Sequence, residues 1–197
     1  KAVDSYEILN NLQTGKQVTD YTDVSKNAWY YDAAKYVTDK HLMGGEKPYV
    51  FGADEALTRA EVASALYNLA GQPKVELASF TDVPVTHQAR TAIAWAAKTG
   101  IMKGVGDNKF EPDRSVSREE IATLLTRQRK LSGVDVTADK NEVSAFVDSA
   151  KISSWAVDGV AYCTKSGLVK GNPGKVFAPA GNTTRAELAT IIQRIAA

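Results

Sequence analysis

Apolar residues recur at helical spacing in six stretches of this chain, and two kinds of stretch alternate. The first kind is rich in alanine, carries an aromatic residue near its middle, and is predicted to form helices at 29–42, 91–101 and 155–168. The second kind follows a hydroxyl residue, at Thr58, Ser117 and Thr184. Each pair is joined by a loop that contains a phenylalanine. The pattern therefore predicts an all-α chain made of three helix–loop–helix repeats.

A glycine follows each helix of the first kind, at Gly45, Gly104 and Gly171. We expect these glycines to supply the left-handed conformation that commonly closes a helix.

Each helix of the second kind begins with a capping box. The stretch 57–62 reads Leu-Thr-Arg-Ala-Glu-Val, and it returns in similar form at 116–121 and 183–188. The hydroxyl accepts from a free N–H of the first turn, and the Glu three residues later reaches back to the cap. Leu57 and Val116 also fit the hydrophobic staple across such a cap, whereas Thr183 breaks that pattern.

The arginine in this stretch has no comparable local task, because positive charge at a helix start opposes the helix dipole. A helix N-terminus together with a guanidinium group forms a ready anion site. We therefore hypothesise that an anionic ligand is held by Arg59, Arg118 and Arg185. The alternative interpretation is that these arginines are solvated helix formers.

The spacing of the copies sets the domain organisation. Arg59 to Arg118 is 59 residues and Arg118 to Arg185 is 67, and the glycines repeat at the same two intervals. We predict a lead-in helix at 1–19 and repeats at 20–73, 78–133 and 144–197. Two short helices rarely bury enough surface alone, so the three pairs must share a core. They could stack as a solenoid, but the lack of an atypical capping repeat favours closure around a pseudo-threefold axis, with grooves between neighbouring repeats.

Composition and charge exclude several function classes. The 197 residues are 44% hydrophobic and carry a net charge of +1, which argues against a nucleic-acid surface and a basic membrane surface. Cys163 is the one cysteine, expected as a buried small side chain, and two histidines make a zinc site improbable. No apolar run approaches the length of a membrane span. We find no triad, paired carboxylates or phosphate loop, and expect neither an enzyme nor a cofactor.

Together these residues resemble three tandem S-layer homology domains. The resemblance covers about residues 20–197 and rests on Phe-Thr-Asp-Val, a following Trp, an alanine-rich helix, a Met-Lys-Gly stretch, Phe-x-Pro and Thr-Arg-Ala-Glu. It implies a three-pronged helical module that attaches an extracellular protein non-covalently to the cell wall or S-layer. The implied partner is secondary cell-wall polysaccharide bound to peptidoglycan, commonly with a pyruvylated terminal sugar. The single carboxylate of a pyruvate ketal suits bidentate binding by arginine.

The resemblance also implies site residues. It assigns ligand contact to Arg59, Arg118 and Arg185, and close backbone approach to Gly45, Gly104 and Gly171. It places the opening aspartates and the following tryptophans along the grooves: Asp23, Asp82, Asp148, Trp29 and Trp155. From the residues alone, the aspartates could instead cap a first turn and the tryptophans could belong to the core. The chain begins at Lys1, and we expect it to be a monomeric module of a larger surface protein.

The second copy departs from this pattern. Glu119 adds a negative charge beside Arg118, and His87 and Gln88 stand where the other copies have tryptophan. We expect the groove formed with this copy to bind weakly or to be structural only. Lys103 and Lys170 could add positive charge to the grooves or could be solvated. The competing function is a helical-repeat adaptor whose arginines face the acidic surface of a partner protein.

Overall fold

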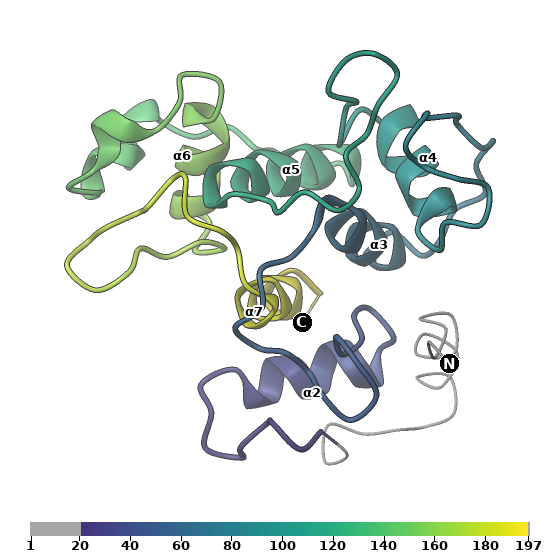
Figure 1. Cartoon of the computed structure of the whole chain (residues 1–197). Coiled ribbons are helices and arrows are strands. Elements are labelled where there is room, and N and C mark those ends of the chain that lie inside the picture. Colours follow the sequence, from purple (N-terminus) through teal and green to yellow (C-terminus); the bar gives the residue numbers. More distant parts are fainter. Residues whose placement is uncertain (1–20, 197) are drawn as a thin grey trace.

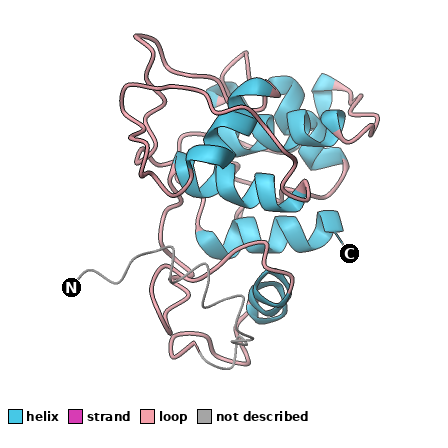
Figure 2. Ribbon diagram, turned by 90° about the vertical axis from the view of Figure 1, so that its right-hand side faces the viewer, coloured by secondary structure: helices cyan, strands magenta, loops and turns pink. Residues whose placement is uncertain are grey.

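The computed structural model describes residues 21–196, so the predicted lead-in helix at 1–19 lies outside the described residues. The all-α prediction is confirmed. The first helix of each repeat is α2 (Tyr31–Asp39), α4 (Arg90–Lys98) or α6 (Val157–Lys165), and the second is α3 (Arg59–Leu69), α5 (Arg118–Leu131) or α7 (Arg185–Ala196). The linker before α6 forms two 3₁₀ helices, η2 (Lys140–Ala145) and η3 (Ser149–Lys151). Within the described residues, Figure 2 shows helices and loops and no strand.

The first helix of each repeat ends earlier than the sequence predicted. A residue in the left-handed region follows shortly after the last helical residue: His41 with φ 55°, Gly100 with φ 74° and Gly167 with φ 70°. Gly45, Gly104 and Gly171 lie beyond these ends and have no positive φ. The prediction that these three glycines close the helices is therefore wrong.

The same three glycines are required for close packing instead. A Cβ added to Gly45 would lie 2.3 Å from the carbonyl oxygen of Val50 and 2.7 Å from the ring of Tyr21. A Cβ on Gly104 would lie 2.8 Å from the oxygen of Lys109, and one on Gly171 would lie 2.8 Å from the ring of Phe146. The loop thus folds back onto the opening aromatic residue of its own repeat, and only glycine leaves room for that contact.

The helices pack across the sequence repeats. Each second helix lies against the first helix of the next repeat: α3 against α4, α5 against α6, and α7 against α2. Figure 1 shows these pairs as three arms that meet near the middle of the molecule. Each predicted repeat therefore contributes one helix to each of two arms, so no repeat can bury its apolar faces without both neighbours.

The three arms are joined at their centre by backbone hydrogen bonds that form a ring. The N–H of Leu57 donates to the oxygen of Thr183, that of Thr183 to Val116, and that of Val116 to Leu57, each at 3.0 Å. All three side chains are buried. A stacked solenoid would leave the first and last repeats apart, whereas here the last repeat bonds to the first. This ring is the arrangement expected of repeats closed around one axis.

One member of the ring, Thr183, carries a buried hydroxyl with no hydrogen-bond partner. Its neighbours in the ring, Leu57 and Val116, both belong to the hydrophobic core. We predict that Thr183→Val stabilises the fold by about 1 kcal/mol, because it removes an unsatisfied polar group and keeps the side-chain shape. Urea unfolding measures the change.

The adjacent Thr184 provides the matched control. Its hydroxyl accepts from the N–H of Glu187 at 3.3 Å, so Thr184→Val is expected to lose about 1 kcal/mol with the cap. A Thr183→Val variant that loses as much stability as Thr184→Val would show that the Thr183 hydroxyl has a partner in solution.

Candidate functional site

The capping boxes form as the sequence predicted, and each capped helix begins at its arginine. The hydroxyl of Thr58 accepts from the N–H of Glu61 at 3.3 Å, and the Glu61 carboxylate accepts from the N–H of Thr58 at 2.8 Å. Ser117 with Glu120 and Thr184 with Glu187 repeat this exchange. The three guanidinium groups therefore start from equivalent positions.

The next backbone N–H groups are occupied by the neighbouring repeat. Those of Arg59 and Ala60 donate to the oxygens of Arg114 and Pro112 at 2.9 Å. Equivalent bonds run from the second repeat to Gly181 and Pro179, and from the third repeat to Glu55 and Ala53. The helix N-terminus is thus filled by loop carbonyls, and the expectation that it serves as an anion site is wrong for the backbone. Any anion must contact the side chains.

Two of the three arginines tie one repeat to the loop of the next. The Nε of Arg59 donates to the oxygen of Phe110 at 2.8 Å, and its Nη2 donates to the oxygen of Lys103 at 2.7 Å. Arg118 makes the same two bonds to Phe177 at 2.7 Å and Lys170 at 3.0 Å. Each guanidinium also lies over the phenylalanine ring, 4.6 Å and 5.5 Å from its centroid. This task could not be predicted from local sequence patterns, because the partner carbonyls are 44–59 residues away along the chain.

Arg185 is held differently, although it is equally buried at 5% exposed. Its Nη2 pairs with the Glu61 carboxylate at 2.5 Å, and its Nη1 reaches the oxygen of Gly44 only at 3.5 Å. Within the described residues, its Nε has no acceptor. The bond to the loop phenylalanine, present in the other two copies, is missing here.

The three arginines also differ in their carboxylate partners. Arg118 pairs with Glu187, and Arg185 pairs with Glu61. Arg59 has no ion pair among residues 21–196, because Glu120, the matching carboxylate, binds Arg114 at 2.6 Å. Burial and then the charge of Arg114 lower the pKa of Arg59 from its usual value. Arg59 is therefore the buried guanidinium whose charge is not neutralised by direct contact.

The opening aspartates hold the phenylalanine loops. Asp23 accepts from the N–H groups of Phe51 and Gly52, both at 2.8 Å, and Asp148 accepts from Phe177 and Ala178 at the same distance. Asp82 likewise accepts from the N–H groups of Phe110 and Glu111. Burial would raise the pKa of Asp82, but these hydrogen bonds hold it below its usual value. The aspartates thus secure a loop rather than a first turn, and their contact with a ligand stays a prediction.

The two tryptophans predicted to line the grooves are on the surface. Trp29 is 68% exposed and Trp155 is 56% exposed, so the interpretation that they belong to the core is wrong. Exposed indole rings are the kind of surface on which sugar rings stack.

Glu119, which was expected to add negative charge beside Arg118, has a different partner. Its carboxylate accepts from the N–H and the hydroxyl of Ser153 at 2.8 and 2.9 Å, and the carboxylate paired with Arg118 is that of Glu187.

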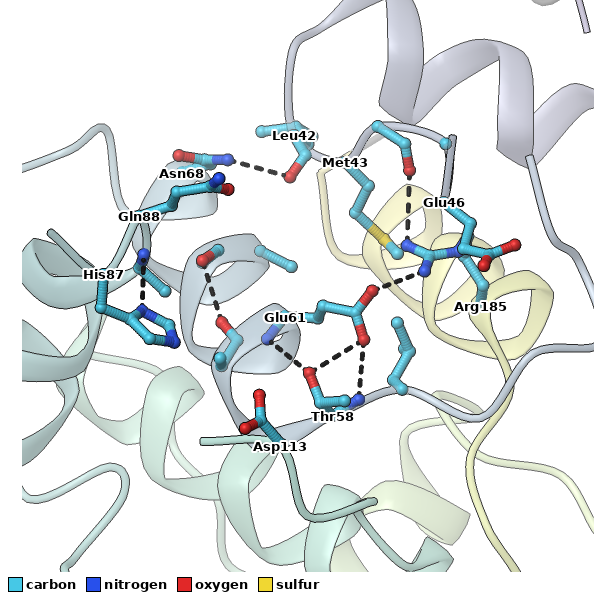
Figure 3. Close-up of a pocket in the computed structure, with 17 residues that line it drawn as sticks. Leu42, Met43, Glu46, Thr58, Glu61, Asn68, His87, Gln88, Asp113 and Arg185 are labelled. Carbon is cyan, nitrogen blue, oxygen red and sulfur yellow. Dashed lines mark hydrogen bonds and ion pairs between the residues drawn. The ribbon is translucent and has the colours of Figure 1, made fainter. Parts of the chain in front are cut away.

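A cleft of about 310 Å³ lies where repeats 1 and 2 meet, beside the arginine of repeat 3 (Figure 3). Its walls include α3, the loop after α2, and the segment just before α4 with His87 and Gln88. Arg185 and Glu61 meet within it, while Asn68 binds the oxygen of Leu42 at 3.2 Å along one side. The cleft thus brings together one predicted arginine and Gly45. The other two predicted arginines, Arg59 and Arg118, hold the equivalent positions in repeats 1 and 2.

In the described part of the chain, no group of three or more His, Cys, Asp or Glu side chains is placed to hold a metal ion. No described helix is both long and apolar enough to cross a membrane. Cys163 is fully buried, as predicted, and burial raises the pKa of its thiol to about 12.

Comparison with known proteins identifies the family. The S-layer homology domain matches the chain at residues 20–63, 79–122 and 145–189. The chain is 33% identical over 176 residues to an amylopullulanase of Thermoanaerobacterium thermosulfurigenes, covering 87% of the chain and 9% of the relative. It is 32% identical over 193 residues to the exoglucanase XynX of Acetivibrio thermocellus, covering 93% and 17%. It is 30% identical over 148 residues to a cellulosome-anchoring protein of Acetivibrio thermocellus, covering 72% and 31%.

The chain therefore belongs to the S-layer homology domain family, which matches it at three tandem positions. Domains of this family are anchoring modules of the bacterial cell surface, and this chain is such a module. It spans less than a third of the length of these relatives, so the enzyme names of the first two describe proteins that extend far beyond it.

The carboxylates that link the repeats predict how stability depends on pH. Burial would raise the pKa of Glu61, but Arg185 and the cap hydrogen bonds hold it below its usual value; Arg114 does the same for Glu120. A lowered pKa in the folded state means that the carboxylate stabilises the fold above its unfolded pKa of about 4.3. We predict a free energy of unfolding that is level from about pH 7 to 5 and then falls with acid.

Glu61→Gln isolates one contribution. At neutral pH the variant should be about 1–2 kcal/mol less stable, because it leaves Arg185 buried without its partner. Its loss of stability below about pH 4.3 should be shallower than that of the wild type. Glu76→Gln removes only a solvent-exposed ion pair with Lys98, so it serves as the control and should match the wild type at every pH. An unchanged acid slope in Glu61→Gln would contradict the assignment.

Proposed function

We propose that this module attaches the protein that carries it to the cell wall by binding an anionic secondary cell-wall polysaccharide. The bound group is the acidic end of the glycan, in the form of a pyruvylated sugar. The polysaccharide is itself joined to peptidoglycan, so the attachment is non-covalent and needs no catalysis. The module acts as a monomer within a longer surface protein.

The observation that carries the proposal is the state of Arg59. It is 6% exposed, lies on the ring of Phe110, and lacks the carboxylate partner that Arg118 and Arg185 have. Its Nε and Nη2 are bound to backbone oxygens, and no bond is found from its Nη1 within residues 21–196. A carboxylate from a ligand would complete this site, since buried charges are stable when they are paired.

The surroundings that correspond to the cleft suit a sugar acid at Arg59. By the register of the repeats, Arg59 takes the place of Arg185, Lys103 that of Gly44, and Trp155 that of Gln88. Lys103 and Trp155 are both exposed. A cation and an indole face beside an unpaired guanidinium favour a ring that carries negative charge.

Binding to cell-wall sacculi tests the proposal. Purified sacculi should retain the chain, and sacculi stripped of secondary polysaccharide by acid should not, because the acidic end of the glycan is gone. Cosedimentation measures the retained fraction. Equal binding to both preparations would contradict the role of the polysaccharide. Failure to bind either, together with capture of one protein from an extract, would favour a protein adaptor.

Single substitutions distinguish the three arginines. We predict that Arg59→Ala lowers the affinity for sacculi tenfold or more, since a charged hydrogen bond contributes about 1.5–3 kcal/mol. Arg118→Ala and Arg185→Ala should lower it less, because each already has a glutamate partner. Thermal unfolding of each variant separates loss of binding from loss of fold.

A surface variant avoids the structural effect of removing a buried arginine. Trp155→Ala should weaken binding with no loss of stability, whereas Leu77→Ala, an exposed apolar residue of the first linker, should do neither. Wild-type affinity in both Arg59→Ala and Trp155→Ala would overturn the proposed site.

A further inference from the structure

We infer that the cleft at Arg185 binds a sugar ring without an acidic substituent, and that it rejects the acidic end assigned above to Arg59. This inference rests on the proposed function, because it takes the ligand to be a wall glycan. It adds that the three equivalent sites are specialised: one receives an acid, and another receives an uncharged part of the polymer.

The charge of the cleft is the first reason. Its lining holds three carboxylates, Glu46, Glu61 and Asp113, against one arginine. Glu61 is already paired with Arg185 at 2.5 Å, and Lys47 from outside the lining pairs with Glu46 at 3.0 Å. Asp113 has no ion pair among residues 21–196. A ligand carboxylate would therefore meet like charges and no unpaired arginine.

The second reason is that two cations of the other copies are absent. Gly44 stands where the later repeats have Lys103 and Lys170. Asn68 stands where they have Arg127 and Arg194, and the structure confirms that equivalence. All three side chains donate to the carbonyl that precedes the loop: Asn68 to Leu42 at 3.2 Å, Arg127 to Ile101 at 3.0 Å, and Arg194 to Leu168 at 2.9 Å. The first copy thus keeps the hydrogen bond and loses the charge.

The third reason is a buried hydrogen-bond donor that has no acceptor. The Nε of Arg185 is buried with no acceptor, whereas those of Arg59 and Arg118 donate to phenylalanine carbonyls. A buried donor without a partner is unfavourable, and a sugar hydroxyl or carbonyl oxygen would satisfy it. Arg185 lines the cleft, where its Nη2 contacts the Glu61 carboxylate (Figure 3).

The remaining lining suits hydroxyl groups. Asn68, Gln88 and His87 present amide and imidazole groups, and Ser64 adds a hydroxyl. Such groups both donate and accept, as sugar hydroxyls do. The volume of about 310 Å³ is at the lower end of the range of small-ligand sites, and fits a single sugar unit better than a long oligomer.

Matched pairs of sugars test the inference on the whole chain. The ¹⁵N-labelled protein is titrated with the methyl glycosides of glucose, galactose and mannose, and with those of the corresponding uronic acids. The side-chain amide of Asn68 and the Nε–H of Arg185 report on the cleft by NMR. At least one neutral glycoside should shift both signals saturably, and its uronic acid should bind there about tenfold more weakly, since the added carboxylate is repelled.

A charge-restoring variant gives the opposite expectation. Gly44→Lys combined with Asn68→Arg supplies the two cations of the later copies, and Arg185 should then respond at least about tenfold more strongly to the uronic acid. Val147→Lys, which adds a cation at an exposed site outside the cleft lining, should leave the preference of the wild type unchanged.

Two results would overturn the inference. One is a uronic acid that shifts Asn68 and Arg185 in the wild type as strongly as its neutral partner. The other is a cleft that responds to none of the six sugars while the same preparation binds sacculi, which would leave the proposed function standing. A preparation that fails to bind sacculi, with the cleft still selecting neutral sugars, would remove the proposed function alone.

Discussion

The structure depends on contacts that each repeat makes with the loop of the next one. A backbone ring through Leu57, Val116 and Thr183 joins the three repeats at their centre. Around it, loop carbonyls of one repeat fill the helix N-terminus of another, and buried arginines reach across the same boundary. Because every arm is built from two repeats, removing one repeat would expose the apolar faces of both neighbours. Closure is therefore a condition for stability as well as for the shape of the clefts.

The arginines combine structural and binding tasks, and this explains an otherwise unfavourable position. Positive charge at a helix start opposes the dipole, but from that position the guanidinium group donates hydrogen bonds to carbonyl oxygens of a distant loop. Burial then makes each charge sensitive to its partner. Two of the three arginines pair with the glutamate of a neighbouring capping box. The third has no such partner, because the corresponding glutamate pairs with Arg114. Small changes outside the shared motif thus produce three different electrostatic sites on one repeated scaffold.

Local patterns were enough to predict much of this fold. The capping boxes, the helix starts at Arg59, Arg118 and Arg185, the all-α class and the buried Cys163 follow from spacing and side-chain chemistry within a few residues. The cross-repeat pairing of α3 with α4 could not be read from sequence, because it depends on which neighbour each apolar face meets. The role of Gly45 was also missed, because glycine is required there by the nearby Val50 carbonyl and Tyr21 ring rather than by a positive φ.

The most direct measurement is a structure of the module bound to the terminal disaccharide of its own wall polysaccharide. Our interpretation places the acidic group of that ligand against Arg59, with the sugar ring beside Trp155 and Lys103. It also places no carboxylate of the ligand in the cleft that holds Arg185 and Asp113. A ligand bound on the outer face of an arm, or an acidic group seated in the Arg185 cleft while Arg59 remains unbound, would contradict it.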